Sequence, residues 1–182
     1  MSFEVSGINL SALAKVLQAE GLYAQVAAEV APETRLVLER PLLSTWHPGR
    51  HGEALWAAVI KVGGPAKLEE LNLKLTRQSF GPVVRPLVKV ALALTGSSPA
   101  TLFSRLNEAV KVATRGLNVT WAPRSASAGD LTFEYPGPID RAVVEHGWRG
   151  VIRFGEELIS QSVRFDGFEA LSDRRFVFHI SW

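Results

Sequence analysis

Four stretches in the C-terminal third of the chain alternate apolar and polar residues with a period of two. They occur as two pairs on either side of a segment with helical periodicity, and they cover residues 117–121, 131–135, 159–165 and 176–182. Successive side chains of a β-strand point to opposite faces, so this alternation predicts a sheet with one buried and one wetter face. The buried face needs a cover, and the mainly helical sequence before residue 116 can supply it.

The sequence therefore predicts an α+β fold. An N-terminal helical layer, about residues 1–115, is expected to pack on a C-terminal four-stranded antiparallel sheet with β-β-α-β-β order, about residues 116–182. A chain of 182 residues is long enough to bury the core of one compact domain, but it is slightly short for two domains. We therefore expect a single domain over residues 1–182.

Apolar spacing predicts helices over residues 9–20 and 23–30, whereas residues 34–39 read as a strand or an extended connector. Four further helices are expected to begin with a proline in the first turn, where the missing N–H costs nothing. They cover residues 48–61, 65–79, 82–94 and 99–114. Residues 139–152 are predicted to form the helix between the strand pairs, with residues 124–129 and 166–173 as the hairpin turns.

Composition excludes several classes of protein. With 47% hydrophobic and 21% charged residues, the chain is not of the disordered type. No apolar run approaches the roughly 18 residues of a membrane span, and the first residues do not read as a secretory signal. We therefore expect a cytoplasmic protein without membrane contact. The net charge of +2 gives no reason to expect nucleic-acid binding.

Metal and cofactor chemistry has little support in the sequence. The chain has no cysteine, which excludes disulfides, thiolate catalysis and iron–sulfur clusters. His47 and His51 have the spacing of two metal ligands on one helical face. However, Pro48 is expected at the start of that helix, and no third ligand is nearby. We therefore expect no metal or cofactor, and we assign these histidines a surface or capping role.

No nucleophile elbow, dinucleotide-binding fingerprint or phosphate-binding loop is present. The neighbouring pairs Glu69–Glu70 and Glu156–Glu157 point apart on a helix, which makes them poor acid–base pairs. An enzyme of unrecognised type remains an alternative, and no catalytic residue is proposed.

Two groups of residues are candidates for ligand binding. The first is a group of cations near the end of one predicted helix and the start of the next: Arg77, Arg85 and Lys89, together with Lys74. These side chains could hold a carboxylate or phosphate at the helix N-terminus near Pro82. The alternative is a solvated face. Aromatic residues on the inner face of the predicted sheet, including Trp121, Phe133 and Phe178, could line an apolar pocket or fill a packed core.

Some local features resemble a known family. The similarity is to a myxobacterial paralogous family of unknown function. It is carried by Glu39–Leu43, Trp46–Gly49, Leu71–Phe80 followed by Val83–Leu94, and Arg175–Trp182. That family is related in fold to haem nitric-oxide-binding and 4-vinyl-reductase domains. The resemblance implies a helical layer on a four-stranded antiparallel sheet, with a cavity between them. The Tyr-x-Ser-x-Arg motif that holds the haem propionates in those sensors is absent here.

The sequence leaves three functions open. The first is a non-enzymatic sensory or protein-interaction module, and the second is a small-molecule-binding domain for an apolar or aromatic carboxylate ligand. The third is the unrecognised enzyme. The partners expected are a small molecule, another protein or a second copy of the chain in a homodimer. A cavity would favour ligand binding, whereas an exposed apolar patch or sheet edge would favour association.

Overall fold

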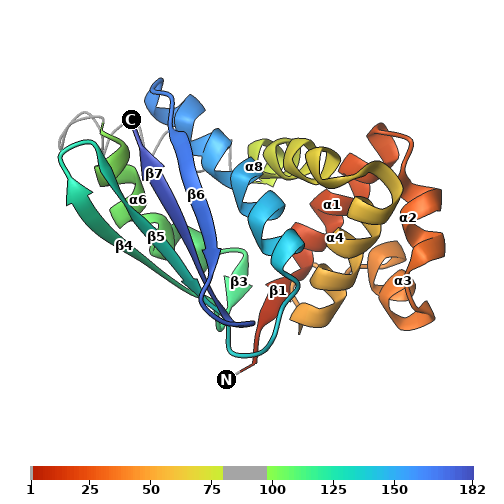
Figure 1. The fold of residues 1–182 in the computed structure, drawn as a ribbon. Helices are drawn as coiled ribbons and strands as arrows, with labels where there is room; N and C mark the ends of the chain where they lie inside the picture. Colours follow the sequence, from red (N-terminus) through yellow and green to blue (C-terminus); the bar gives the residue numbers. More distant parts are fainter. Residues whose placement is uncertain (1, 80–97) are drawn as a thin grey trace.

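The computed structural model describes residues 2–79 and 98–182, and it confirms the predicted α+β class. The central feature is a four-stranded antiparallel sheet with strand order β4-β5-β7-β6 (Figure 1). Its elements follow the expected β-β-α-β-β order: β4 (Asn118–Ser125), β5 (Ala128–Glu134), α8 (Arg141–Ile159), β6 (Arg164–Ala170) and β7 (Arg175–Ser181).

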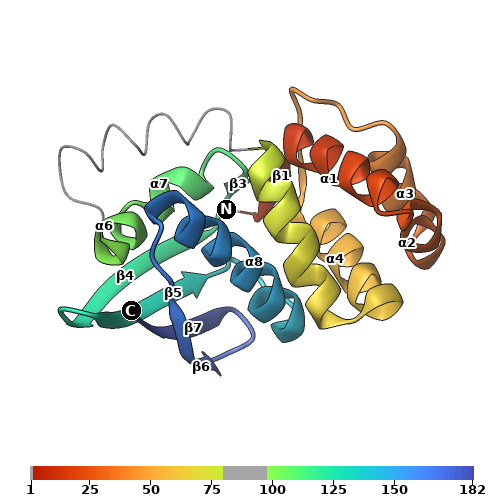
Figure 2. The ribbon, with the colours of Figure 1, turned by 90° about the horizontal axis from the view of Figure 1, so that it is seen from above.

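One face of the sheet is buried under three helices. Leu131 and Phe133 of β5 lie beside Phe178 and Phe176 of β7, and all four side chains are almost fully buried. Helix α8 and the short helices α6 (Pro99–Ser104) and α7 (Leu106–Val110) lie over this face (Figure 2). The alternation seen in the sequence therefore separates the core side of these strands from the solvent side.

The N-terminal helices form a second hydrophobic core of their own. These are α1 (Gly7–Ala19), α2 (Tyr23–Glu29), α3 (Pro32–Glu39), α4 (Gly49–Gly63) and a helix over residues 65–79. Leu17, Val26, Leu55 and Leu68 lie at the centre of this core with no exposed surface. A small antiparallel sheet, in the order β2-β1-β3, connects the two parts through β1 (Glu4–Ser6), β2 (Trp46–Pro48) and β3 (Thr114–Arg115).

Helix α8 and the helix over residues 65–79 pack closely against each other. A Cβ atom at Gly150 would lie 2.4 Å from the backbone oxygen of Glu69, so only glycine fits at this point. Nearby, the Asn72 side-chain amide donates a 3.0 Å hydrogen bond to the backbone oxygen of Gly147. His146 Nδ1 lies 2.8 Å from a carboxylate oxygen of Glu69. This crossing places the N-terminal helices against the element that covers the sheet (Figure 1).

Residues 34–39 are helical, so the prediction of a strand or extended connector there was wrong. They belong to α3, which begins at Pro32, a residue whose fixed φ suits the first helical turn. Thr34 and Leu38 stand one turn apart, and both are buried. The stretch covers fewer than two full helical periods, which is why its pattern was ambiguous.

The helix predicted over residues 99–114 is divided into α6 and α7, with Arg105 between them. The Ser104 hydroxyl donates a 2.8 Å hydrogen bond to the backbone oxygen of Thr101. The backbone N–H of Arg105 bonds to the oxygen of Leu102, in the tighter three-residue pattern. The helical chain ends at Val110, and Thr114 already belongs to β3. Serine and threonine hydroxyls compete with regular helix hydrogen bonds in this way.

Two strand boundaries also differ from the predictions. Ile159 is the last residue of α8, where it is buried, and Ser160 ends the helix with a φ of 54°. The third strand therefore begins at Arg164 and continues to Ala170, so the second hairpin turn follows Ala170 instead of starting at Asp166. In the first hairpin, residues that were predicted as a loop continue the pairing as far as Ser125 opposite Ala128. The helix predicted over residues 82–94 lies outside the described residues.

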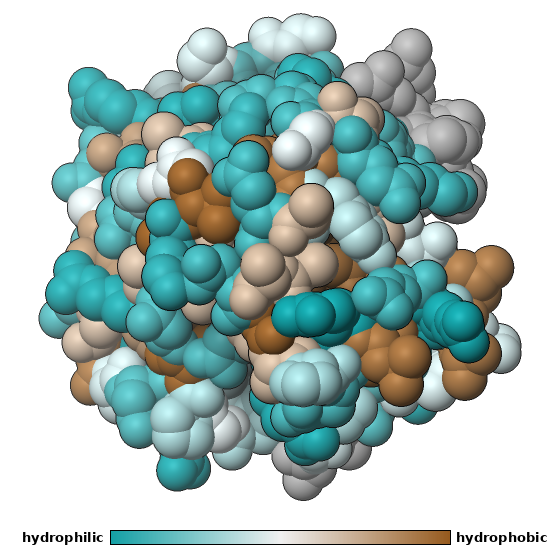
Figure 3. Space-filling model, turned by 90° about the vertical axis from the view of Figure 1, so that its right-hand side faces the viewer, coloured by the Kyte–Doolittle hydropathy of each residue, from teal (hydrophilic) through white to brown (hydrophobic). Residues whose placement is uncertain are grey.

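No helix among the described residues is long and apolar enough to cross a membrane. On the face shown in Figure 3, hydrophobic residues form small groups among hydrophilic ones. Large side chains with at least half of their surface exposed are scattered over several elements: Ile8, Leu36, Leu42, Leu43, Val112 and Leu171.

Phe178→Ala is expected to lower the free energy of unfolding by about 3–5 kcal/mol, because it leaves a cavity in the core beneath α8. Phe178 has no exposed surface and contacts Phe133, Phe165 and Phe168. Val112→Ala, at a residue that is 65% exposed, should change stability by less than about 0.5 kcal/mol. Urea melts of both variants measure the difference, and a loss below about 1 kcal/mol for Phe178→Ala would contradict this assignment of the strand face.

Candidate functional site

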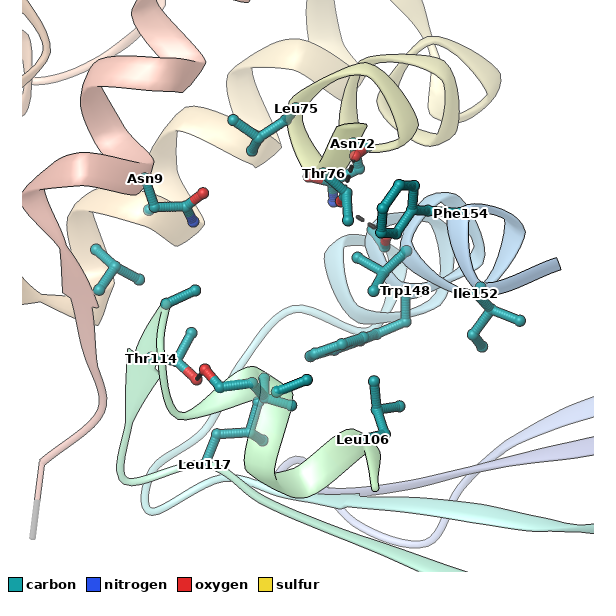
Figure 4. A pocket seen from close by; sticks show the side chains of 18 of the residues that line it. Asn9, Asn72, Leu75, Thr76, Leu106, Thr114, Leu117, Trp148, Ile152 and Phe154 are labelled. Carbon is teal, nitrogen blue, oxygen red and sulfur yellow. Dashed lines mark hydrogen bonds between the residues drawn. The ribbon is translucent and has the colours of Figure 1, made fainter. Parts of the chain in front are cut away.

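A cavity of about 220 Å³ lies between the two hydrophobic cores. Its wall comes from α1 and β1, α4, the helix over residues 65–79, the α6–α7 segment and α8 (Figure 4). Most of the lining is apolar, including Leu75, Leu106, Leu117, Val151 and Ile152. Because both parts of the molecule contribute to the wall, a molecule held there would contact both.

Trp148 separates the cavity from the core above the sheet. Its ring lines the cavity and also packs against Phe133, with ring centroids 4.3 Å apart. Its indole N–H donates a 2.8 Å hydrogen bond to the Tyr135 hydroxyl. Burial raises the pKa of the Tyr135 hydroxyl above its usual range, so the group stays neutral. This part of the wall is therefore aromatic and uncharged.

Glycine residues of α8 allow Leu102 and Asn72 to lie close to the backbone of this helix at the cavity wall. A Cβ atom at Gly155 would lie 2.7 Å from a methyl carbon of Leu102, and one at Gly147 would lie 3.1 Å from the Asn72 amide nitrogen. Both glycines line the cavity. Larger residues at these positions would therefore push into their neighbours at the cavity wall.

The polar groups in the wall are few, and most have partners inside the protein. The Thr76 hydroxyl donates to the backbone oxygen of Asn72 at 2.6 Å, and the Thr114 hydroxyl donates to that of Val110 at 3.2 Å. Glu53 accepts a 2.9 Å hydrogen bond from the backbone N–H of Asp140. The exception is Asn9, whose Oδ1 is buried without a hydrogen-bond partner in the part of the chain that the structure describes.

A second hollow, of about 260 Å³, adjoins the first at Phe3, Glu53, Tyr135 and Ile139. Its lining contains the exposed guanidinium of Arg50 and the Pro136–Pro138 turn. Charged side chains are therefore more prominent in this second hollow than in the apolar cavity.

The aromatic candidates from the sequence lie away from the cavity. Phe133 and Phe178 contact each other in the core, with ring centroids 5.6 Å apart and no exposed surface. Trp121 packs against Phe103 and Trp182, at centroid distances of 5.3 and 5.9 Å. None of the three candidates is among the residues that line the cavity. They fill the space between the sheet and its covering helices.

The cationic candidates are not brought together at a described site. Arg77 forms an ion pair with Glu157 of α8, and its Nε donates a 2.9 Å hydrogen bond to that carboxylate. This hydrogen bond raises the pKa of Arg77. Lys74 pairs with Glu20 and Glu70. Arg85 and Lys89 lie outside the described residues.

Sequence reasoning missed the polar residues that do line the cavity, Asn9, Asn72 and Thr76. Single amides and hydroxyls in amphipathic helices are common, so nothing in the sequence marked them. The available signal was the set of glycines in the α8 segment, Gly147, Gly150 and Gly155. Glycine is unfavourable within a helix, and its presence there indicates a close approach of another element.

The fold is similar to that of H-NOX proteins. An iron(II) unliganded H-NOX protein from K. algicida has a TM-score of 0.67 and 12% identity, covering 97% of this chain and 95% of that chain. A mutant of that protein has a TM-score of 0.72 and 10% identity over the same shares. A structure from a study of haem distortion in the H-NOX family has a TM-score of 0.60 and 13% identity, covering 97% and 94%.

These likenesses show that the chain has an H-NOX-like α+β fold. No protein-family model matches the chain, and no curated protein matches it. At such low identity the similarity is one of architecture, and the chemistry of the site must be judged from the residues of this chain.

The residues present do not fit a haem group. Haem iron is held by an axial histidine, cysteine, methionine or tyrosine. No histidine lines the cavity, and residues 80–97 contain none of these four residue types. Tyr135 does line it, but its hydroxyl accepts the Trp148 hydrogen bond and its raised pKa keeps it protonated. The cavity therefore offers no suitable axial ligand.

We expect the purified protein to bind no haem, because an axial ligand is missing from the cavity wall. Haem should be added to the protein and excess removed by gel filtration before the ultraviolet–visible spectrum is recorded. A Soret band at close to one haem per chain would contradict this expectation. If such a band appeared, its loss in Tyr135→Phe would identify the tyrosine as the ligand.

The two histidines that were considered as metal ligands have different surroundings. His47 lies in β2, whereas His51 is buried in α4 with Nδ1 2.9 Å from the Thr34 hydroxyl. The surface or capping role predicted for His51 was therefore wrong, because α3 covers it. Within residues 2–79 and 98–182, no group of three or more histidine or carboxylate side chains could hold a metal ion.

The surroundings of His51 make stability depend on pH. Burial is the main cause that lowers the pKa of His51 below its usual value of 6.5, and the charges of Arg50 and His47 act in the same direction. The unfolded chain then binds a proton that the folded chain excludes. Stability should be complete above about pH 6.5 and fall as the pH drops through that value toward the folded-state pKa.

Urea melts between pH 5.5 and 7.5 should show this loss for the wild type, with a slope of at most about 1.4 kcal/mol per pH unit for one proton. His51→Gln, which keeps a polar side chain without titrating, should flatten the dependence. An unchanged slope in the variant would assign the effect to another group.

Proposed function

We propose that this chain is a non-enzymatic sensory module that binds a small, predominantly apolar molecule in the cavity between its two cores. The observation that carries the proposal is the cavity itself, which a purely structural or association module would not need. Apolar walls with a few placed polar groups are typical of small-molecule sites. An engineered cavity of about 150 Å³ in another protein holds benzene, so about 220 Å³ suits a one- or two-ring molecule.

The position of the cavity supports a sensory role. Asn9, Trp56 and Leu75 come from the N-terminal core, whereas Leu106 and Trp148 belong to the part that covers the sheet. A bound molecule would favour the arrangement of the two parts in which it contacts both walls. The resulting shift in population is the event that a downstream partner could detect.

The other predictions from the sequence remain proposals of lower rank. An aromatic carboxylate ligand would need a cation, and Arg77 is already paired with Glu157. Protein association or homodimerisation would use exposed apolar side chains such as Ile8, Leu42 and Leu43, which come from two stretches whose backbones lie close together at Gly7. The relation to the myxobacterial family, the cytoplasmic location and the single domain over residues 1–182 also belong to this proposal.

Filling the cavity should abolish ligand binding without unfolding the protein. Ala109 of α7 and Val151 of α8 both line the cavity, and Ala109→Phe or Val151→Phe places a ring in the available space. Ala57→Phe, on an exposed part of α4, is the matched control. Indole, benzothiophene and indole-3-carboxylate are suitable probes, with thermal melts and calorimetry at fixed ionic strength as measurements.

We expect the two neutral probes to stabilise the wild type and Ala57→Phe, by about 2.7 kcal/mol at a hundredfold excess over the dissociation constant. Neither cavity-filling variant should respond. Binding of neither neutral probe by the wild type would contradict the proposal. Tighter binding of indole-3-carboxylate than of indole would instead support the aromatic carboxylate alternative.

A further inference from the structure

We propose that Asn9 selects the ligand, and that the ligand is a neutral ring compound with a hydrogen-bond donor, either a hydroxyl or a ring N–H. The inference rests on the proposed function and concerns the same cavity. It starts from one atom: Oδ1 of Asn9, which is buried and has no hydrogen-bond partner among the described residues. An unpaired buried carbonyl is unfavourable, so a group that donates to it gains affinity.

Asn9 is held in a defined position by the start of α1. The hydroxyl of Ser6, the N-cap residue, accepts a 3.2 Å hydrogen bond from the Asn9 backbone N–H. The side chain extends from α1 into the space between the helices, facing the wall formed by Thr76 and Trp148 (Figure 4). Asn9 lines the cavity, and because its Oδ1 has almost no accessible surface, a ligand donor meets that oxygen after a rotation of the side-chain amide.

The remaining polar groups leave little for a ligand to bind. Hydrogen bonds inside the protein use one N–H of Asn72, the hydroxyls of Thr76 and Thr114, and the indole N–H of Trp148. Three other buried polar atoms lack partners, but they belong to residues outside the cavity lining, namely His47, Ser79 and Arg149. The buried atom of the described lining that lacks a partner is thus Asn9 Oδ1, an acceptor, and a ligand would have to supply the donor.

The charges around the cavity favour a neutral ligand. The part of its lining that belongs to the described residues contains one carboxylate, Glu53, and one guanidinium, the exposed Arg105, and the two charges cancel. A carboxylate ligand has no proton to donate to the oxygen of Asn9, and it would lose its hydration without a buried cation among the described residues to replace it. A hydroxyl or ring N–H can donate to the oxygen of Asn9, and removing it from water costs much less free energy than removing a carboxylate.

The test compares indole with benzothiophene, which has a similar shape but no N–H donor. Calorimetry gives the ratio of the benzothiophene to the indole dissociation constant in the wild type and in Asn9→Leu, a variant of similar size without an acceptor. We expect this ratio to be about tenfold higher in the wild type than in the variant. The comparison of ratios removes the difference in hydrophobicity between the two probes.

A second measurement needs no variant. In the wild type, the N–H proton of bound ¹⁵N-labelled indole should move downfield in a heteronuclear NMR spectrum, as expected for a hydrogen-bonded donor. Thermal melts of Asn9→Leu verify that it is folded before binding is measured.

The outcomes separate this inference from the function on which it rests. If both probes bind but the ratio is the same in wild type and Asn9→Leu, or the N–H signal does not move, the assignment to Asn9 is overturned while the ligand site remains. If neither probe binds the wild type, the proposed function fails and this assignment fails with it.

Discussion

The close crossing of α8 and the helix over residues 65–79 determines the rest of the arrangement. Gly150 allows the backbone of α8 to approach Glu69 at a distance that any side chain would prevent. The Asn72–Gly147 and His146–Glu69 contacts then fix the register of the two helices. Since α8 also covers the sheet, this one crossing positions the N-terminal core relative to the C-terminal core. The cavity lies beside this crossing, and Asn72 and Gly147 belong to both.

The cavity illustrates how a fold can be kept while its chemistry differs. The likeness to H-NOX proteins extends over nearly the whole chain, yet the wall of this cavity has no group suited to haem iron. Trp148 and Tyr135 instead bond to each other and present an uncharged aromatic surface. A fold of two cores can form a cavity between them, and the side chains that line this cavity determine which kind of molecule it could bind.

The sequence predicted those parts of the fold that depend on local periodicity. The sheet was recognised because its strands largely alternate apolar and polar residues, with Leu131 and Phe133 on either side of Thr132, and α1 because its apolar stripe is long. Residues 34–39 were not recognised, because a two-turn helix has too few positions to separate a period of 3.6 from one of two. The break at Arg105 also escaped, since it depends on the competition of hydroxyl groups for backbone oxygens.

The site could not be predicted in the same way, because a cavity is a space that side chains leave unfilled. Phe133 and Phe178 were reasonable candidates as large aromatic residues on an inner sheet face, but such residues fill space whenever a helix lies over them. Small residues such as Gly155 and Ala109 line the cavity, and neither has a pattern of its own in the sequence. The role of Asn9 is less visible still. An amide on α1 is ordinary in the sequence, and its burial without a hydrogen-bond partner among the described residues is visible only in the structure.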